Sequence, residues 1–239
     1  NNAGRKLEFE RAGILKKQIE SILYVTQQTR LISRYMENPN LIDDLRDQAL
    51  SDLADSIGLS GRHLTRIEAY DNSNIQGSQA VSAMVVFTRG EPDPKQYRKF
   101  RIKTVKGIDD YKMIAEVLTR RFKRISPNSK QKFNLRDRKF MDINADESFE
   151  AVPDLIVIDG GKGQLSAASE VLASLNLPLP VIGLAKRLEE IYLPGNKAPL
   201  RLAKDSEALK LVQYLRDEAH RFALSYHRNL RNKALIGAT

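Results

Sequence analysis

A short apolar run in the second half of the chain limits the possible folds more than any other feature. Residues 155–158 read Leu-Ile-Val-Ile, and Asp159-Gly-Gly-Lys-Gly-Gln follows them directly. A continuous apolar run of this length is typical of a strand buried on both faces, as in a parallel sheet covered by crossover helices. A segment with helical spacing and a second apolar run, residues 181–185, come next. The order strand, helix, strand predicts a parallel α/β unit.

The residues before this unit predict an antiparallel meander followed by a helix. Residues 66–71, 80–88 and 97–105 have strand character, and short connections separate them. A helix over residues 109–124 follows, with Asp109 and Asp110 supplying its N-cap and first-turn charge. Together with the parallel strands, this order predicts an α/β fold with a mixed five-stranded sheet and flanking helices.

The ends of the chain predict helices. Helical spacing of apolar residues over 5–23, 24–36 and 41–57, closing at Gly58, indicates a helical N-terminal arm. A hairpin over 189–202 and a long helix over 206–230 end the α/β part. Residues 126–150 are mostly polar and predict a mobile surface loop. The expected organisation is a helix over 1–23, a helical linker over 24–60 and a domain over 61–239.

Composition narrows the chemistry and the cell compartment. The chain has no cysteine, which excludes disulfides, thiolate metal sites and cysteine nucleophiles. There is no run of about 18 apolar residues and no secretory signal pattern, so we expect a cytoplasmic protein without a membrane contact. Asp, Glu and His are the residue types left for metal binding or catalysis.

The positive charge of the chain is concentrated in two segments. The net charge is +9, and residues 89–125 carry 12 basic against 5 acidic side chains while residues 201–239 carry 8 against 4. Clustering of this kind is the electrostatic footprint of a polyanion partner, and nucleic acid is the leading candidate. The alternative is that these Lys and Arg residues only solvate helix faces.

Two aspartates at predicted strand ends are the main candidates for chemistry. Asp71 ends the first strand and Asp159 ends the buried run. Ligands of α/β sheets bind beyond the carboxyl ends of strands, so the two carboxylates meet if their strands are neighbours. At a separation of about 4 Å they would repel by about 4 kcal/mol at an effective dielectric near 20, which a divalent cation such as Mg²⁺ or Mn²⁺ would offset. Alternatively, Asp159 is a helix-capping turn residue and Asp71 forms an Asx-turn.

A histidine of the last helix is a third candidate. His220 lies just beyond the edge of the apolar stripe of that helix, where a side chain reaches the rim of a sheet. His227 is two turns further, roughly 10 Å along the axis, so the two histidines cannot bind one ion together. A lone helix histidine is otherwise a surface or core-edge residue.

Basic residues near these positions are candidates for phosphate contacts. Lys162 follows the glycines after Asp159, but the segment lacks the spacing of a nucleotide-binding P-loop. The glycines would instead let the backbone approach a DNA phosphate at the helix N-terminus. The predicted phosphate-binding residues are Arg120, Arg121, Lys123, Arg124, Lys162, Arg216 and Arg228.

Six blocks of sequence resemble a known family in the same order. Between residues 65 and 230 they are similar to the C-terminal half of the bacterial nucleotide excision repair excinuclease family UvrC. The blocks are Ile67-Glu-Ala-Tyr-Asp-Asn-Ser-Asn-Ile-Gln-Gly, Tyr97-Arg-Lys-Phe-Arg-Ile-Lys-Thr-Val, Asp109-Asp-Tyr, Pro153-Asp-Leu-Ile-Val-Ile-Asp-Gly-Gly-Lys-Gly-Gln, Gly183-Leu-Ala-Lys-Arg and Arg216-Asp-Glu-Ala-His-Arg-Phe-Ala.

The resemblance implies a ribonuclease H-like fold and a metal-dependent DNA endonuclease that cuts the damaged strand on the 5′ side of a lesion. It implies that Asp71, Asp159 and His220, rather than His227, form the catalytic site, and that Asp110 matches a further acidic residue of the family. The other nuclease domain and the helix-hairpin-helix motifs of the family have no counterpart in this sequence. The alternative is a catalytically silent module of the same fold that docks DNA or a partner.

The N-terminal helix carries a second, shorter resemblance. Residues 7–19 are similar to the second helix of the UVR motif, through which the family docks onto the helicase UvrB. Gly13 and Lys17 stand where the motif usually has alanine and aspartate. The resemblance therefore implies DNA and UvrB as partners of a protein that we expect to be a monomer.

Overall fold

A computed structural model describes residues 41–75, 78–105, 109–123, 151–185 and 190–236, without the side chains of 73–79 and 226–236. The predicted helices over 5–36 and the predicted loop over 126–150 lie outside these residues. The chain divides into two units, Asn1–Leu45 and Arg46–Thr239, and the sheet and the site belong to the second. Helix α3 (Leu41–Ser56) confirms the helix predicted over 41–57. Gly58 follows it with a φ of 79°, a left-handed conformation that favours glycine.

One mixed sheet organises the second unit, as predicted. Its strand order is β3-β2-β1-β5-β6-β7, and β4 also pairs with β2, along residues 81–84. β1 pairs with β2 and β2 with β4 in antiparallel fashion, which confirms the meander, and β5 is parallel to both β1 and β6. The strands are β1 (Arg66–Ile75), β2 (Ser78–Thr88), β3 (Glu91–Pro92), β4 (Arg98–Arg101), β5 (Leu155–Ile158), β6 (Val181–Ala185) and β7 (Glu190–Tyr192).

The sheet has seven strands instead of the predicted five. The two additional strands are β3, which contains only two residues, and β7, the first arm of the predicted hairpin, which pairs antiparallel with β6. The two residues of β3 carry too little alternation to be recognised as a strand, and the hairpin pattern did not reveal that its first arm joins this sheet. The α/β class itself is as expected.

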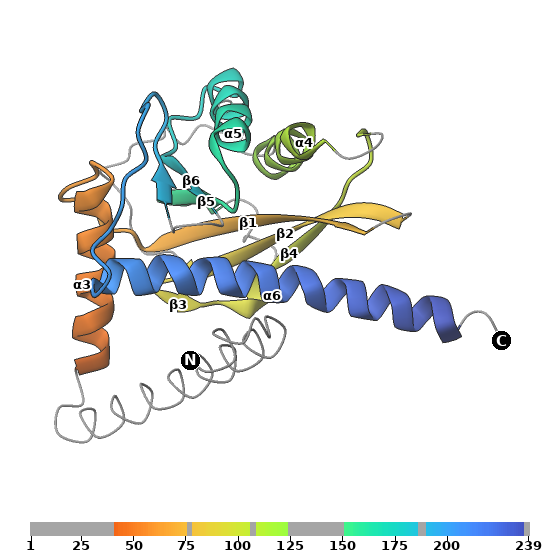
Figure 1. Ribbon diagram of the computed structural model, residues 1–239, viewed down its shortest axis with the longest axis horizontal. Coiled ribbons are helices and arrows are strands. Elements are labelled where there is room, and N and C mark those ends of the chain that lie inside the picture. Colours follow the sequence, from red (N-terminus) through yellow and green to blue (C-terminus); the bar gives the residue numbers. More distant parts are fainter. Residues whose placement is uncertain (1–40, 76–77, 106–108, 124–150, 186–189, 237–239) are drawn as a thin grey trace, which may run out of the picture. The chain divides into compact units, whose positions relative to one another are not determined.

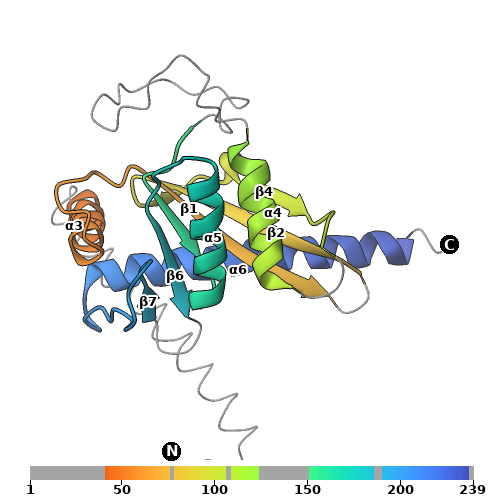
Figure 2. The ribbon, with the colours of Figure 1, turned by 90° about the horizontal axis from the view of Figure 1, so that it is seen from above.

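Helices cover both faces of the sheet. Figures 1 and 2 show α4 (Asp110–Phe122) and α5 (Lys162–Ser174) on one face and the long α6 (Glu207–Ile236) across the other. Alternation along β1 divides its side chains between the two cores, because Tyr70 packs with the residues of α4 and α5 while Ile67 and Ala69 pack with those of α6. None of the described helices is long and apolar enough to span a membrane.

Local sequence explains where α4 and β5 form. The Asp109 carboxylate accepts a hydrogen bond of 3.0 Å from the backbone N–H of Lys112, which confirms the predicted N-cap of α4. This capping and the ammonium of Lys112 lower the pKa of Asp109. All four residues of β5 are buried, as its continuous apolar run predicts.

Candidate active site

The two predicted aspartates lie at the same level of the sheet, Asp71 within β1 and Asp159 directly after the adjacent strand β5. The last residue pair of the parallel β1–β5 ladder is Tyr70 with Ile158, and the N–H of Asp159 donates a 2.8 Å hydrogen bond to the carbonyl of Tyr70. Both aspartates are largely buried, with exposures of 2% for Asp71 and 7% for Asp159. β1 and β5 are therefore neighbours, which was the condition for Asp71 and Asp159 to share a site.

Asp71 does not end its strand, contrary to the prediction. β1 continues to Ile75 because its antiparallel pairing with β2 extends past the point where β5 stops. Asp71 therefore lies inside β1, at the level where the parallel part of the sheet ends. This is still the carboxyl edge of β5, where α/β sheets bind their ligands.

Helix α6 brings His220 onto Asp71. The imidazole Nδ1 lies 3.2 Å from Asp71 Oδ2, and the His220 side chain is 55% exposed while Asp71 is buried beneath it. An ionised carboxylate can only accept hydrogen bonds, so Nδ1–H is the donor in this contact. The neutral ring then carries its lone pair on Nε2, the nitrogen suited to bind a metal or accept a proton.

Hydrogen bonds and an aromatic contact hold α6 against Tyr97, the residue before β4. Tyr97 Oη donates a 2.9 Å hydrogen bond to Glu218 Oε1, and Arg221 binds the same carboxylate through two bonds of 2.6 Å. The Phe222 ring packs edge-on against Tyr97, with ring centres 5.0 Å apart. Arg221 lowers the pKa of Glu218, and this outweighs the opposite effect of burial. These contacts bracket His220 in the sequence and hold the turn that carries it.

A pocket of about 710 Å³ lies beside Asp159. The middle of β1, the ends of β5 and β6 and the first turns of α4 and α5 line it, through Asn72, Asp109, Asp110, Tyr111, Asp159, Gly160, Gly161, Lys162, Gly163, Gln164 and Ala185. Asn72 Nδ2 donates a 3.2 Å hydrogen bond to the carbonyl of Asp110, which orients the amide. Its buried Oδ1 has no hydrogen-bond partner among the described residues. A buried acceptor of this kind calls for a donor or a cation.

The predicted catalytic residues thus gather at one edge of the sheet in two groups. Asp71 contacts His220, whereas Asp159 shares its pocket with Asp110, the further acidic residue. In the part of the chain that the structure describes, no three His, Asp or Glu side chains lie close enough to hold a metal ion by themselves.

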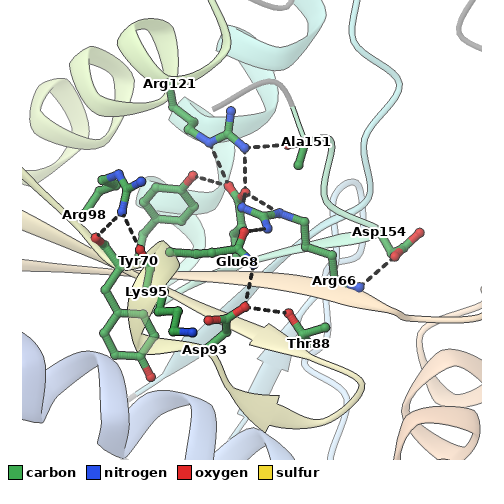
Figure 3. Close-up of polar contacts among 12 residues, drawn as sticks. Arg66, Glu68, Tyr70, Thr88, Asp93, Lys95, Arg98, Arg121, Ala151 and Asp154 are labelled. Carbon is green, nitrogen blue, oxygen red and sulfur yellow. Dashed lines mark hydrogen bonds and ion pairs between the residues drawn. The ribbon is translucent and has the colours of Figure 1, made fainter. Parts of the chain in front are cut away.

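Arg121 requires a correction, because it is not available to DNA. Its side chain is fully buried, and Nη2 donates hydrogen bonds of 2.7 Å to Glu68 and 2.6 Å to the carbonyl of Ala151 (Figure 3). Glu68 also accepts bonds from Tyr70 Oη at 2.7 Å and from Arg66 Nε at 2.9 Å. The guanidinium is thus the partner of a buried carboxylate in the core.

This buried network shifts the pKa values of its members. Burial alone would raise the pKa of Glu68, but Arg121 and Arg66 outweigh it and lower that pKa. Burial and the neighbouring Glu68 carboxylate raise the pKa of Tyr70. Glu68 was not predicted from the sequence, although a glutamate on the same strand face as Tyr70 is a recognisable signal of a buried charge.

The other predicted phosphate-binding residues differ in their exposure and in their interaction partners. Arg120 pairs with Glu116 at 3.1 Å, Arg216 pairs with Asp217 at 2.9 Å, and Lys123 is exposed. Lys162 lines the pocket and donates a hydrogen bond to the carbonyl of Lys197. Arg124 and the side chains of His227 and Arg228 lie outside the described residues.

The mixed sheet has acidic residues at the carboxyl end of β5 and a histidine of α6 beside Asp71, and the comparison with protein families assigns the domain to the class of ribonuclease H-like endonucleases. A family model described as the UvrC RNAse H endonuclease domain matches residues 55–224. The chain therefore belongs to the UvrC family.

Curated relatives support this assignment over most of the chain. The UvrABC system protein C of Dehalococcoides mccartyi is 46% identical over 225 residues, which cover 93% of this chain and 34% of the relative. The protein of the same name from Methanosphaera stadtmanae is 49% identical over 169 residues, covering 70% and 26%, respectively. The chain thus spans about a quarter to a third of the length of these curated relatives.

Solved structures with some similarity include two endonuclease V proteins. Ciona intestinalis endonuclease V in complex with inosine-containing DNA has a TM-score of 0.34 and 19% identity, covering 78% of this chain and 68% of that chain. Human ENDOV has a TM-score of 0.33 and 12% identity, covering 75% and 95%.

Proposed function

We propose that this domain is a metal-dependent DNA endonuclease that makes the 5′ incision beside a lesion in nucleotide excision repair, as part of the UvrABC system. The contact between His220 and Asp71, at the level of Asp159 on the adjacent strand, is the observation that carries the proposal. It joins an imidazole to the acidic edge of the sheet, in a family whose matching domain is described as an endonuclease.

Asp71 and Asp159 would hold the ion, which we propose to be Mg²⁺ or Mn²⁺. The residues at this edge fit a hard divalent cation: buried carboxylates, the carboxylate of Asp110 in the neighbouring pocket, and the buried amide oxygen of Asn72. Mg²⁺ usually keeps several waters and binds through one or two carboxylates, so a cluster of three side chains is not required. When bound, the ion supplies Lewis acidity and offsets negative charge on the phosphate.

His220 is the residue best suited to move a proton. With Nδ1–H donated to Asp71, its Nε2 can hold the attacking water and accept its proton. The buried Asp71 carboxylate keeps the ring in this tautomer and orientation. If His220 instead binds the ion directly, the same contact with Asp71 orients it for that role.

DNA binding would draw on the basic end of α4 and on the first turn of α5. Among the described residues, Arg120, Lys123 and Lys162 would contact the phosphates. Arg121 is left out because its side chain is buried. We further propose that the protein is a cytoplasmic monomer with UvrB as its partner, docked through residues 1–23.

The direct test is Asp71→Asn, assayed for incision of lesion-containing DNA in a reconstituted repair system. Loss of the 5′ cut is expected, while the exposed control Asp205→Asn cuts like the wild type. Undiminished incision by Asp71→Asn would contradict the enzyme proposal and favour the silent docking module. DNA binding measured in parallel separates loss of chemistry from loss of substrate.

A further inference from the structure

One exposed aromatic side chain lines the acidic pocket. Tyr111, the second residue of α4, is 57% exposed and faces the same pocket as Asp159 and Asp110. The other large apolar side chains that are exposed in the described part of the chain, Tyr214 and Leu224, do not line it. The Tyr214 ring also packs edge-on against Phe87, with ring centres 5.2 Å apart. Internal packing therefore accounts for Tyr214 better than for Tyr111.

The position of the Tyr111 ring depends on a glycine of α5. A Cβ atom added at Gly163 would lie 2.4 Å from Cε1 and 2.7 Å from Oη of Tyr111. Any side chain at position 163 would therefore displace the ring. The absence of a side chain at Gly163 lets the ring rest across the first turns of α4 and α5, with more than half of the residue open to solvent.

The pocket is mainly acidic, so a nucleic acid would bind there more readily through a contact that involves no charge. Asp109, Asp110 and Asp159 line it together with one lysine, Lys162, so its own electrostatics oppose the entry of a polyanion. An aromatic ring attracts a nucleic acid without charge, because every base has a face that can stack on it. Stacking also contributes strongly enough to matter, at roughly a 5- to 100-fold gain in affinity per base.

We propose that Tyr111 is a stacking platform for an unpaired base of the DNA strand next to the cleavage site. This inference rests on the proposed nuclease function, because it assigns the base to the strand that passes Asp159. Stacking on a ring reads no hydrogen-bond pattern, so the platform would accept all four bases. Tyr111 is then a residue that positions the substrate and takes no part in proton transfer.

The test compares Tyr111→Leu with Tyr111→Phe in binding of a dye-labelled oligodeoxynucleotide with a short unpaired region. We expect Tyr111→Leu to weaken binding roughly 5- to 100-fold, and Tyr111→Phe to bind within about twofold of the wild type. The slope of log K against log salt should be the same in all three proteins, since no charge is removed. A 2-aminopurine at the unpaired position should be quenched by the wild type and by Tyr111→Phe, but not by Tyr111→Leu.

Gly163→Ala tests the same idea with the tyrosine in place. The added methyl group displaces the ring, so binding should weaken as in Tyr111→Leu, and the double variant should bind no more weakly than Tyr111→Leu alone. Thermal unfolding establishes that each variant is folded, and Gly163→Ala carries the test if Tyr111→Leu does not fold.

The outcomes separate this inference from the proposed function. Folded Tyr111→Leu or Gly163→Ala protein that binds within twofold of the wild type would overturn the stacking platform and leave the nuclease proposal intact. A wild-type chain that binds no oligodeoxynucleotide would overturn both.

Discussion

His220 Nδ1 lies 3.2 Å from Asp71 Oδ2, although 149 residues separate the two in the sequence. This contact joins the last helix to the first strand, at the level where the parallel part of the sheet ends. If His220 accepts a proton from the attacking water, His220→Ala should lower the rate of incision by about 10²- to 10⁴-fold. Single-turnover incision kinetics measure this effect.

The histidine that serves as a control is His63, which is exposed in the loop after α3. His63→Ala should cut at the wild-type rate. Equal rates for His220→Ala and His63→Ala would show that the imidazole next to Asp71 takes no part in the reaction.

Metal binding should stabilise the folded chain through Asp71 and Asp159. A ligand that binds only the folded state at 100 times its Kd adds about 2.7 kcal/mol to the free energy of unfolding. Mn²⁺ should therefore raise the Tm of the wild type and of Asp205→Asn, and EDTA should reverse the increase. In Asp71→Asn and Asp159→Asn the increase should shrink or vanish. An equal Tm increase in all four proteins would place the ion elsewhere.

Neighbouring arginines of α4 should differ sharply in their effect on stability. Arg121→Ala leaves the buried Glu68 carboxylate without its main partner, and we expect it to lower the free energy of unfolding by about 3–5 kcal/mol. Arg120, whose side chain is 37% exposed, pairs with Glu116 near the surface, and Arg120→Ala should cost less than about 1 kcal/mol. Urea unfolding curves compare the two, and similar midpoints would contradict the buried pair.

Glu218 predicts a pH dependence of stability. Its pKa is lowered in the folded state, so its ionisation contributes stability that is present above the ordinary glutamate pKa of about 4.5 and is lost as pH falls through the lowered value. Glu218→Gln should remove this component, so the stability difference from the wild type should shrink below about pH 4.5. A stability difference that stays constant over the whole pH range would contradict this role of the Glu218 carboxylate. Urea midpoints between pH 3 and 7 provide the measurement.

Local sequence patterns predicted those features that depend on only a few consecutive residues, such as the burial of a strand or the start of a helix. The apolar run at 155–158 indicated burial on both faces, and Asp109 was recognised as the N-cap of α4. The end of β1 was not predictable in this way, because its length depends on pairing with β2 after β5 has ended. Asp71 was therefore expected at the end of a strand and lies within one.

Arg121 shows that the number of basic residues in a segment does not establish which of them are exposed. The basic run from Arg120 to Arg124 was read as one exposed surface, but Arg121 follows Ile114, Val117 and Leu118 at helical spacing and lies on their buried stripe. An arginine on an inner stripe together with a glutamate on an inward strand position predicts a buried ion pair. Neither pattern predicts the contact between His220 and Asp71, because this contact depends on how α6 crosses the sheet.

The hydrogen bond from Arg121 to the carbonyl of Ala151 ties the end of α4 to the segment that leads into β5. The same guanidinium binds Glu68 on β1. One side chain therefore joins the end of α4 and the segment before β5 to the sheet. Loss of this side chain would therefore loosen the end of α4, β1 and the entry to β5 together, so hydrogen exchange at these three places should respond as one cooperative unit.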